Sequence, residues 1–198
     1  MKFDEVAKRE AQRAAVKALR DAPYNLNPKL STSPAMLVQE TPWVNTTTSF
    51  NFDFSVNGPA LAPGVNNNVK IGMNDLFAVY GIQVLLATGT NPASFVYRAH
   101  GVLAADDAVY NSIVSIKTES STYVDKIPGQ YFRDFGSNAN EYYGDVGMQL
   151  MNPIRIVNGR LGVFTVTIDV LNLTSALVIS ANTQISMRLH GVYGQVVG

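Results

Sequence analysis

The sequence predicts an all-β fold, an antiparallel β-sandwich of about eight strands that follows an α-helix. Two observations lead to this prediction. After residue 49, apolar and polar residues alternate in several short segments that are separated by turn residues. No helical pattern between these segments is long enough for the crossover connections of a parallel sheet. The length of 198 residues suits one domain with an appendage.

Residues 1–22 are expected to form a charged helical arm that ends before Pro23. They hold six of the 15 basic and four of the 15 acidic residues of the chain. A stripe of this helix that consists mostly of alanine buries little apolar surface, so the helix should either fray or dock on another surface. The stripe recurs at three- and four-residue steps and comprises Phe3, Ala7, Ala11, Ala14 and Ala18.

A second stripe on the same helix is basic and comprises Arg9, Arg13, Lys17 and Arg20. A ridge of positive charge can lie on phosphate groups or on an acidic partner surface. The alternative, which is somewhat favoured, is an ordinary solvated helix face, because charge stripes on helices are common.

Residues 23–48 are expected to form an extended connector. Prolines at this spacing exclude a helix and a central strand. Apolar residues such as Trp43 distinguish the segment from a flexible linker. We therefore expect it to lie on a surface, either its own or that of a neighbour. The prolines are Pro23, Pro28, Pro34 and Pro42.

Residues 49–198 are expected to form the β-sandwich itself. Its strand count fits a jelly-roll-like arrangement or another Greek-key sandwich. The segment 76–87 is expected to be one strand bent at Gly81 or a pair of strands, and 119–145 is expected to be mostly loop. The other expected strands are 49–56, 69–71, 94–100, 109–118, 146–151, 154–157, 161–170, 177–179 and 184–193.

The body of the chain is sparsely charged, since its last 176 residues hold only 20 charged side chains. Such a surface loses little hydration when it meets a neighbour, which favours extensive subunit contacts. A secreted-type sandwich with a polar, uncharged surface is the alternative. Neither a signal peptide nor a membrane-spanning segment is recognisable, so a soluble protein is expected.

Residues with catalytic or metal-binding chemistry are few. The chain has no cysteine, which excludes disulfides, thiol nucleophiles and thiolate metal sites. His100 and His190 lie on the polar faces of expected strands, outside any metal-binding pattern. Asp106 and Asp107 are adjacent and cannot face one another across a cleft. The oxygen-bearing side chains between 134 and 141 lack the spacing of an EF-hand calcium loop. We expect no catalytic residue, cofactor or metal site, and no enzymatic activity.

Tyrosines gather in the loop-rich middle of the chain. Exposed tyrosine beside asparagine and glycine is typical of binding surfaces. A small apolar cluster beneath a long loop is the alternative. The residues of this expected contact surface are Tyr123, Tyr131, Tyr142 and Tyr143.

The layout of charged arm, proline-rich connector and about eight strands resembles the jelly-roll capsid subunits of icosahedral non-enveloped viruses and phages. The resemblance implies a virion structural protein that assembles with copies of itself and other particle proteins in the host cytoplasm. It also implies that residues 2–20 tie neighbouring subunits or genome together along the inner shell. The arm has a net charge of only plus two, so contacts to subunits or to an inner membrane face are favoured over tight nucleic-acid binding. No small-molecule substrate is expected.

A carbohydrate- or receptor-binding β-sandwich is the alternative function, with the tyrosine-rich loop as its site. Such a module has no need of residues 1–48, so their deletion should leave its binding intact. An assembling shell subunit would instead lose correct assembly.

Overall fold

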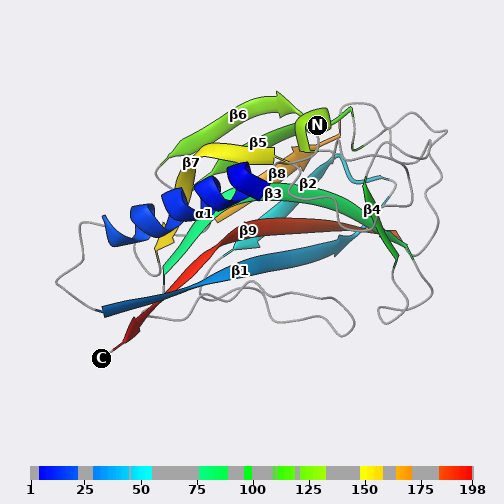
Figure 1. Cartoon of the computed structure of the whole chain (residues 1–198). Coiled ribbons are helices and arrows are strands. Elements are labelled where there is room, and N and C mark those ends of the chain that lie inside the picture. Colours follow the sequence, from blue (N-terminus) through cyan, green and yellow to red (C-terminus); the bar gives the residue numbers. More distant parts are fainter. Residues whose placement is uncertain are drawn as a thin grey trace.

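The computed structural model describes residues 5–21, 29–44, 46–54, 76–88, 96–99, 109, 111–118, 121–132, 148–157, 164–170 and 183–197. In chain order the elements are α1 (Glu5–Arg20), β1 (Lys29–Pro42), β2 (Ser49–Phe54), β3 (Leu76–Thr88), β4 (Val96–Ala99), β5 (Ile113–Lys117), β6 (Thr122–Pro128), the 3₁₀ helix η3 (Gly129–Phe132), β7 (Met148–Val157), β8 (Phe164–Asp169) and β9 (Thr183–Val197). The strands form two layers, with α1 lying against one of them (Figure 1).

Both sheets are antiparallel, as the sequence predicts. The first has the strand order β1-β9-β3-β4, and β7 pairs with β3 on the side that β4 occupies further along. The second has the order β2-β8-β5-β6. The prediction of an all-β sandwich with a preceding helix is therefore confirmed.

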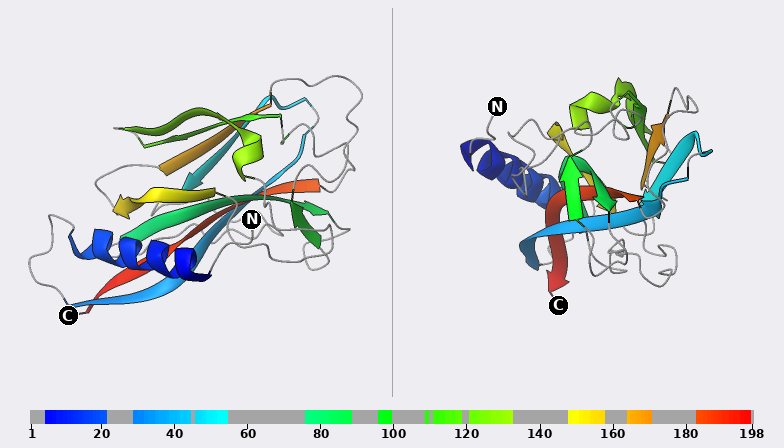
Figure 2. Two further views of the ribbon diagram at one scale, coloured as in Figure 1. Left: turned by 45° about the horizontal axis from the view of Figure 1, so that its top comes forward. Right: turned by 90° about the vertical axis from the view of Figure 1, so that its right-hand side faces the viewer.

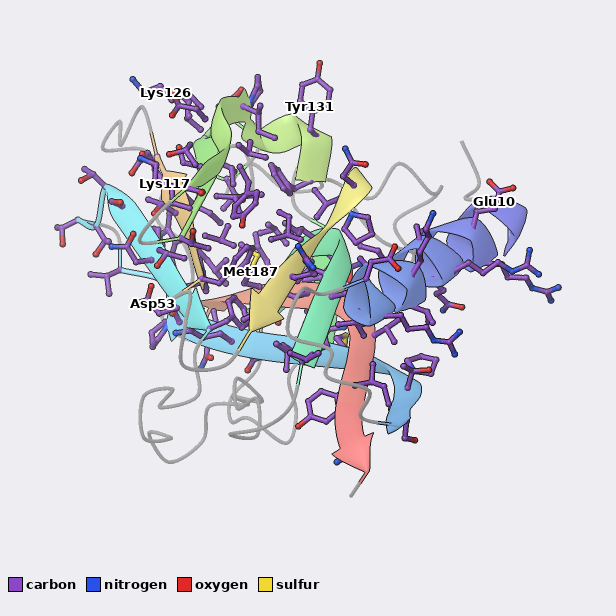
Figure 3. All side chains as sticks on the ribbon, turned by 90° about the vertical axis from the view of Figure 1, so that its left-hand side faces the viewer. Glu10, Asp53, Lys117, Lys126, Tyr131 and Met187 are labelled. Atoms are coloured by element: carbon purple, nitrogen blue, oxygen red, sulfur yellow. The ribbon has the colours of Figure 1, made fainter. Side chains whose placement is uncertain are left out.

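The core lies between the two sheets and follows the alternation in the sequence. Phe50, Phe52 and Phe54 of β2 are buried, while the residues between them face outward. Met187 of β9 contributes from the first sheet and lies between the layers (Figure 3). Trp43 stacks on Phe50 with a ring-centroid distance of 5.0 Å. Burial of a side chain of this size stabilises the fold by about 2–3 kcal/mol.

Residues 29–42, expected as part of an extended connector, are extended but form strand β1 of the first sheet. β1 pairs with β9 over its whole length, from Lys29 opposite Val197 to Pro42 opposite Gln184. It lies at the margin of the sheet, where proline is tolerated because only one side of the strand needs ladder hydrogen bonds. The pairing partner is distant in sequence, which is why local pattern did not reveal it. The division into units at residues 22 and 48 stays a prediction.

Residues 122–132 were expected to be mostly loop, and this prediction was wrong. They form β6 and η3. Val124 and Ile127 both pack against the core although an odd spacing separates them. A β-bulge explains this spacing, because two residues of β6 lie between the pairs that it makes with Val114 and Ile116 of β5. Lys126 lies within the bulge with a φ of 52°. The bulge breaks the strict alternation of core-facing and outward-facing residues, so the sequence pattern did not indicate a strand here.

Residues 76–88 form one strand, β3, which is one of the two arrangements that the sequence predicts, and its irregularity lies next to Gly81. Its register with β9 shifts between Val79 and Gly81, which leaves Tyr80 as a bulged residue. The two strands expected at 146–151 and 154–157 are one strand, β7, and its pairing with β3 skips residues 150–153 around Pro153. The expected strands at 69–71 and 177–179 lie outside the described residues.

Candidate interaction surfaces

Helix α1 docks on the outer face of the first sheet, over β3, β7 and β9 (Figures 1 and 2). Ala11, Ala15 and Leu19 are buried in this contact. Their partners on the sheet are Ala78, Tyr80 and Val192. The helix therefore packs over the bulge of β3, because the side chain of the bulged residue Tyr80 contacts α1.

One polar contact accompanies the docking. The Gln12 Nε2 donates a hydrogen bond to the Tyr80 hydroxyl at 3.4 Å. Next to it, Leu19 lies over Gly194 of β9, where an added Cβ would come within 3.3 Å of the Leu19 Cδ1. The glycine thus lets a large side chain of the helix approach the sheet closely.

The buried face of α1 agrees only in part with the stripe that the sequence predicts. Ala11 is buried and Ala18 is half-buried, as predicted, but Ala14 is exposed, and Ala15 and Leu19 are buried instead. Alanines occur on several sides of the helix, so the pattern did not select one face. The sheet selects it, because only one rotation seats Leu19 above Gly194 and Gln12 beside Tyr80. Phe3 and the side chain of Ala7 lie outside the described part.

The four basic residues predicted to share a face do so. We call Arg9, Arg13, Lys17 and Arg20 the basic ridge; all four side chains are exposed. At 3.6 residues per turn they fall within roughly 80° of helix rotation, on the side away from Ala15. An open groove of about 520 Å³ runs along this side. Among the described residues it is lined by the basic ridge together with Gln12, Val16 and Asp21.

Charge reversal in the basic ridge tests the predicted contact of this ridge with phosphate groups. We expect the double variant Arg13→Glu and Lys17→Glu to bind single-stranded RNA more weakly than the wild type at low salt. Two lost phosphate contacts should reduce the slope of log affinity against log salt by about 1.4. The measurement is binding of a labelled oligonucleotide at several salt concentrations.

The matched control makes the same change of charge on the second sheet, at the exposed residues Lys117 and Lys126. It should bind almost as well as the wild type. Equal losses in both double variants would show that overall charge, and not the ridge, governs the binding.

The expected tyrosine surface is only partly placed. Tyr123 of β6 has 43% of its surface exposed and Tyr131 of η3 has 56%. Their neighbour Phe132 is fully buried in the core. Tyr142 and Tyr143 lie outside the described residues, so a common surface of all four stays a prediction.

A row of side-chain hydrogen bonds, which we call the polar ladder, joins the outer faces of β2 and β8 and was not predicted from the sequence. The Ser49 hydroxyl donates to Asp169 at 2.7 Å, Thr167 donates to Asn51 at 2.8 Å and Thr165 donates to Asp53 at 2.6 Å. The signal was present in the alternating polar residues of both segments. Their pairing, however, depends on a register between strands that are more than 100 residues apart.

No metal-binding cluster forms within the part of the chain that the structure describes: no three His, Asp or Glu side chains come together there. His190 Nε2 lies 3.3 Å from the amide oxygen of Gln83. Across the described residues, no helix combines the length and the apolar character required to cross a membrane. Comparison with family models, with curated proteins and with solved structures finds no match to this chain.

Proposed function

We propose that this chain is a structural subunit of a virus or phage shell, which self-assembles through its β-sandwich and its N-terminal arm. The proposal includes a jelly-roll topology for the sandwich. The observation that carries it is the nested order of strand pairing.

The pairing is nested because strands from the two ends of the chain meet first. β1 pairs with β9, β2 with β8, β3 with β7 and β5 with β6. This order is expected when one long antiparallel ribbon folds over to make two facing sheets. Jelly rolls have eight strands in two sheets and are frequent in viral capsid and lectin domains. β4 is an addition outside the nested set.

Two further features favour assembly within that class. The sparsely charged body can form contacts with little loss of charge hydration. Helix α1 holds an exposed basic ridge on one side and a modest apolar contact on the other. A helix with these properties can link a subunit to an acidic surface of a neighbour or to the particle interior.

Carbohydrate or receptor binding is a second candidate function, because lectin domains share the jelly-roll fold. The specific observation in its favour is the exposure of Tyr123 and Tyr131. Exposed tyrosines provide flat apolar surface with a polar edge, which suits contact with a ligand.

Mass in solution separates the two functions. We expect the purified full-length chain to form discrete oligomers or closed particles in light scattering and negative-stain images. Deletion of residues 1–21 should leave a β-rich body that assembles incorrectly or not at all. A chain that stays monomeric at every concentration and salt would contradict the shell function. Glycan binding that survives the deletion would support the second candidate.

A further inference from the structure

The margins of the two sheets differ in their capacity to pair with another strand. Edge strands with regular geometry are templates for pairing, and proteins usually block them with proline, bulges or charge. β1 carries Pro34 and Pro42, which cannot donate to its ladder with β9, so their nitrogens face the free edge. β6 carries the bulge at Lys126 and ends at Pro128. β7 contains Pro153, and its neighbour β4 has four residues.

β2 carries neither a proline nor a bulge, and its one charged residue, Asp53, accepts a hydrogen bond from Thr165. Its six residues contain no proline or glycine, and its register with β8 is continuous from Ser49 to Phe54. The phenylalanines fix the strand from inside, and the polar ladder of Ser49, Asn51 and Asp53 fixes it from outside. The strand is therefore held by contacts on both of its faces at the margin of its sheet.

The backbone groups that β2 presents to its free side can be assigned. The Val170 amide donates to the Thr48 carbonyl at 2.8 Å, which places even-numbered residues in hydrogen-bonded pairs with β8. The N–H and C=O groups of the odd-numbered residues Ser49, Asn51 and Asp53 consequently point to the opposite side. None of the described strands pairs with β2 on that side.

We propose that β2 pairs antiparallel with β2 of a second copy of this chain, about a two-fold axis at Asn51. This register uses all three outward positions in each copy and makes about six backbone hydrogen bonds. It sets Asn51 opposite its own copy, where amide donors and acceptors are complementary. It also sets Asp53 opposite Ser49, so no like charges face one another directly.

The pairing would join the two four-stranded sheets into one continuous sheet of two subunits. β2 and α1 lie on opposite sides of the molecule (Figure 3), so the contact leaves the helix and its basic ridge accessible. The inference deepens the proposed assembly function, since it names one of the contacts by which subunits would meet.

Cysteine cross-linking tests the pairing directly, because the 198 residues contain no cysteine. Residues opposite one another in a hydrogen-bonded pair have Cα atoms about 5.5 Å apart, within the range that a disulfide spans. We expect the variant Asn51→Cys to form a covalent dimer under mild oxidation at least tenfold faster than the controls Ser33→Cys and Tyr131→Cys. Both control positions are exposed, one on the blocked edge of β1 and one on η3.

The variant Asn51→Ser, which cannot cross-link, checks that loss of the Thr167 contact leaves the fold intact by circular dichroism. Equal cross-linking rates at positions 51, 33 and 131 would overturn the pairing. If the wild type then still forms oligomers, the shell function stands without it. If Asn51→Cys cross-links rapidly but the wild type never exceeds the mass of a dimer, the pairing holds and the shell function fails.

Discussion

Replacement of Gly191 by alanine is expected to destabilise the sandwich by roughly 3 kcal/mol or more. Gly191 lies in the middle of β9, opposite Val79 of β3 and Ala35 of β1. An added Cβ would approach the Phe77 ring to 2.4 Å and the Ala78 carbonyl oxygen to 2.5 Å. Because the Phe77 ring is fully buried and the oxygen belongs to the backbone of a paired strand, neither can move away cheaply. Chemical denaturation measures the loss, which is a large part of the stability of a domain of this size.

Gly194→Ala in the same strand is the matched control. Its added Cβ would come within 3.1 Å of the Leu30 Cδ2 and 3.3 Å of the Leu19 Cδ1, both ends of flexible side chains. We expect a change below about 1 kcal/mol, because these side chains can adjust. Equal effects of the two substitutions would contradict the close approach of β9 to Phe77.

Replacement of Ala15 by aspartate is expected to release helix α1 from the sheet. Ala15 is fully buried against the first sheet, so a carboxylate there would be desolvated without a partner. Undocking of the helix avoids this desolvation. It loses the apolar contacts of Ala11, Ala15 and Leu19, whose burial contributes on the order of 3 kcal/mol. The sandwich should remain folded while α1 gains fast amide exchange and protease sensitivity. Hydrogen exchange followed by mass spectrometry measures both regions in one experiment.

Ala14→Asp provides the control, because Ala14 is adjacent in sequence but exposed. It should leave exchange in α1 close to that of the wild type. A similar release by both variants would indicate that helix propensity, and not docking, governs the order of α1. If docking also positions the arm for assembly, Ala15→Asp should form fewer or smaller oligomers than Ala14→Asp at the same concentration.

The sequence by itself determined the fold class and several strands. β2, β8 and β9 follow from their alternation, because apolar residues on one face of each strand lie in the core. β3 follows instead from a long, mostly apolar run, which suits a strand that is buried on both faces. Of the two arrangements expected for residues 76–87, a strand pair or one strand bent at Gly81, the structure has one strand with a bulge at Tyr80. The shared face of the basic ridge was also predicted, since a helix of known period places residues 9, 13, 17 and 20 together.

Only the tertiary structure decided the features that depend on distant partners. Residues 29–42 became a strand because β9, more than 140 residues later, offers a complete ladder. The bulge in β6 concealed that strand from any strict period of two. The docked face of α1 depends on Gly194 and Tyr80 of the sheet, and the ladder of β2 depends on its register with β8. Local periodicity specifies which face of an element is apolar, whereas register and docking depend on contacts between segments that are far apart in the chain.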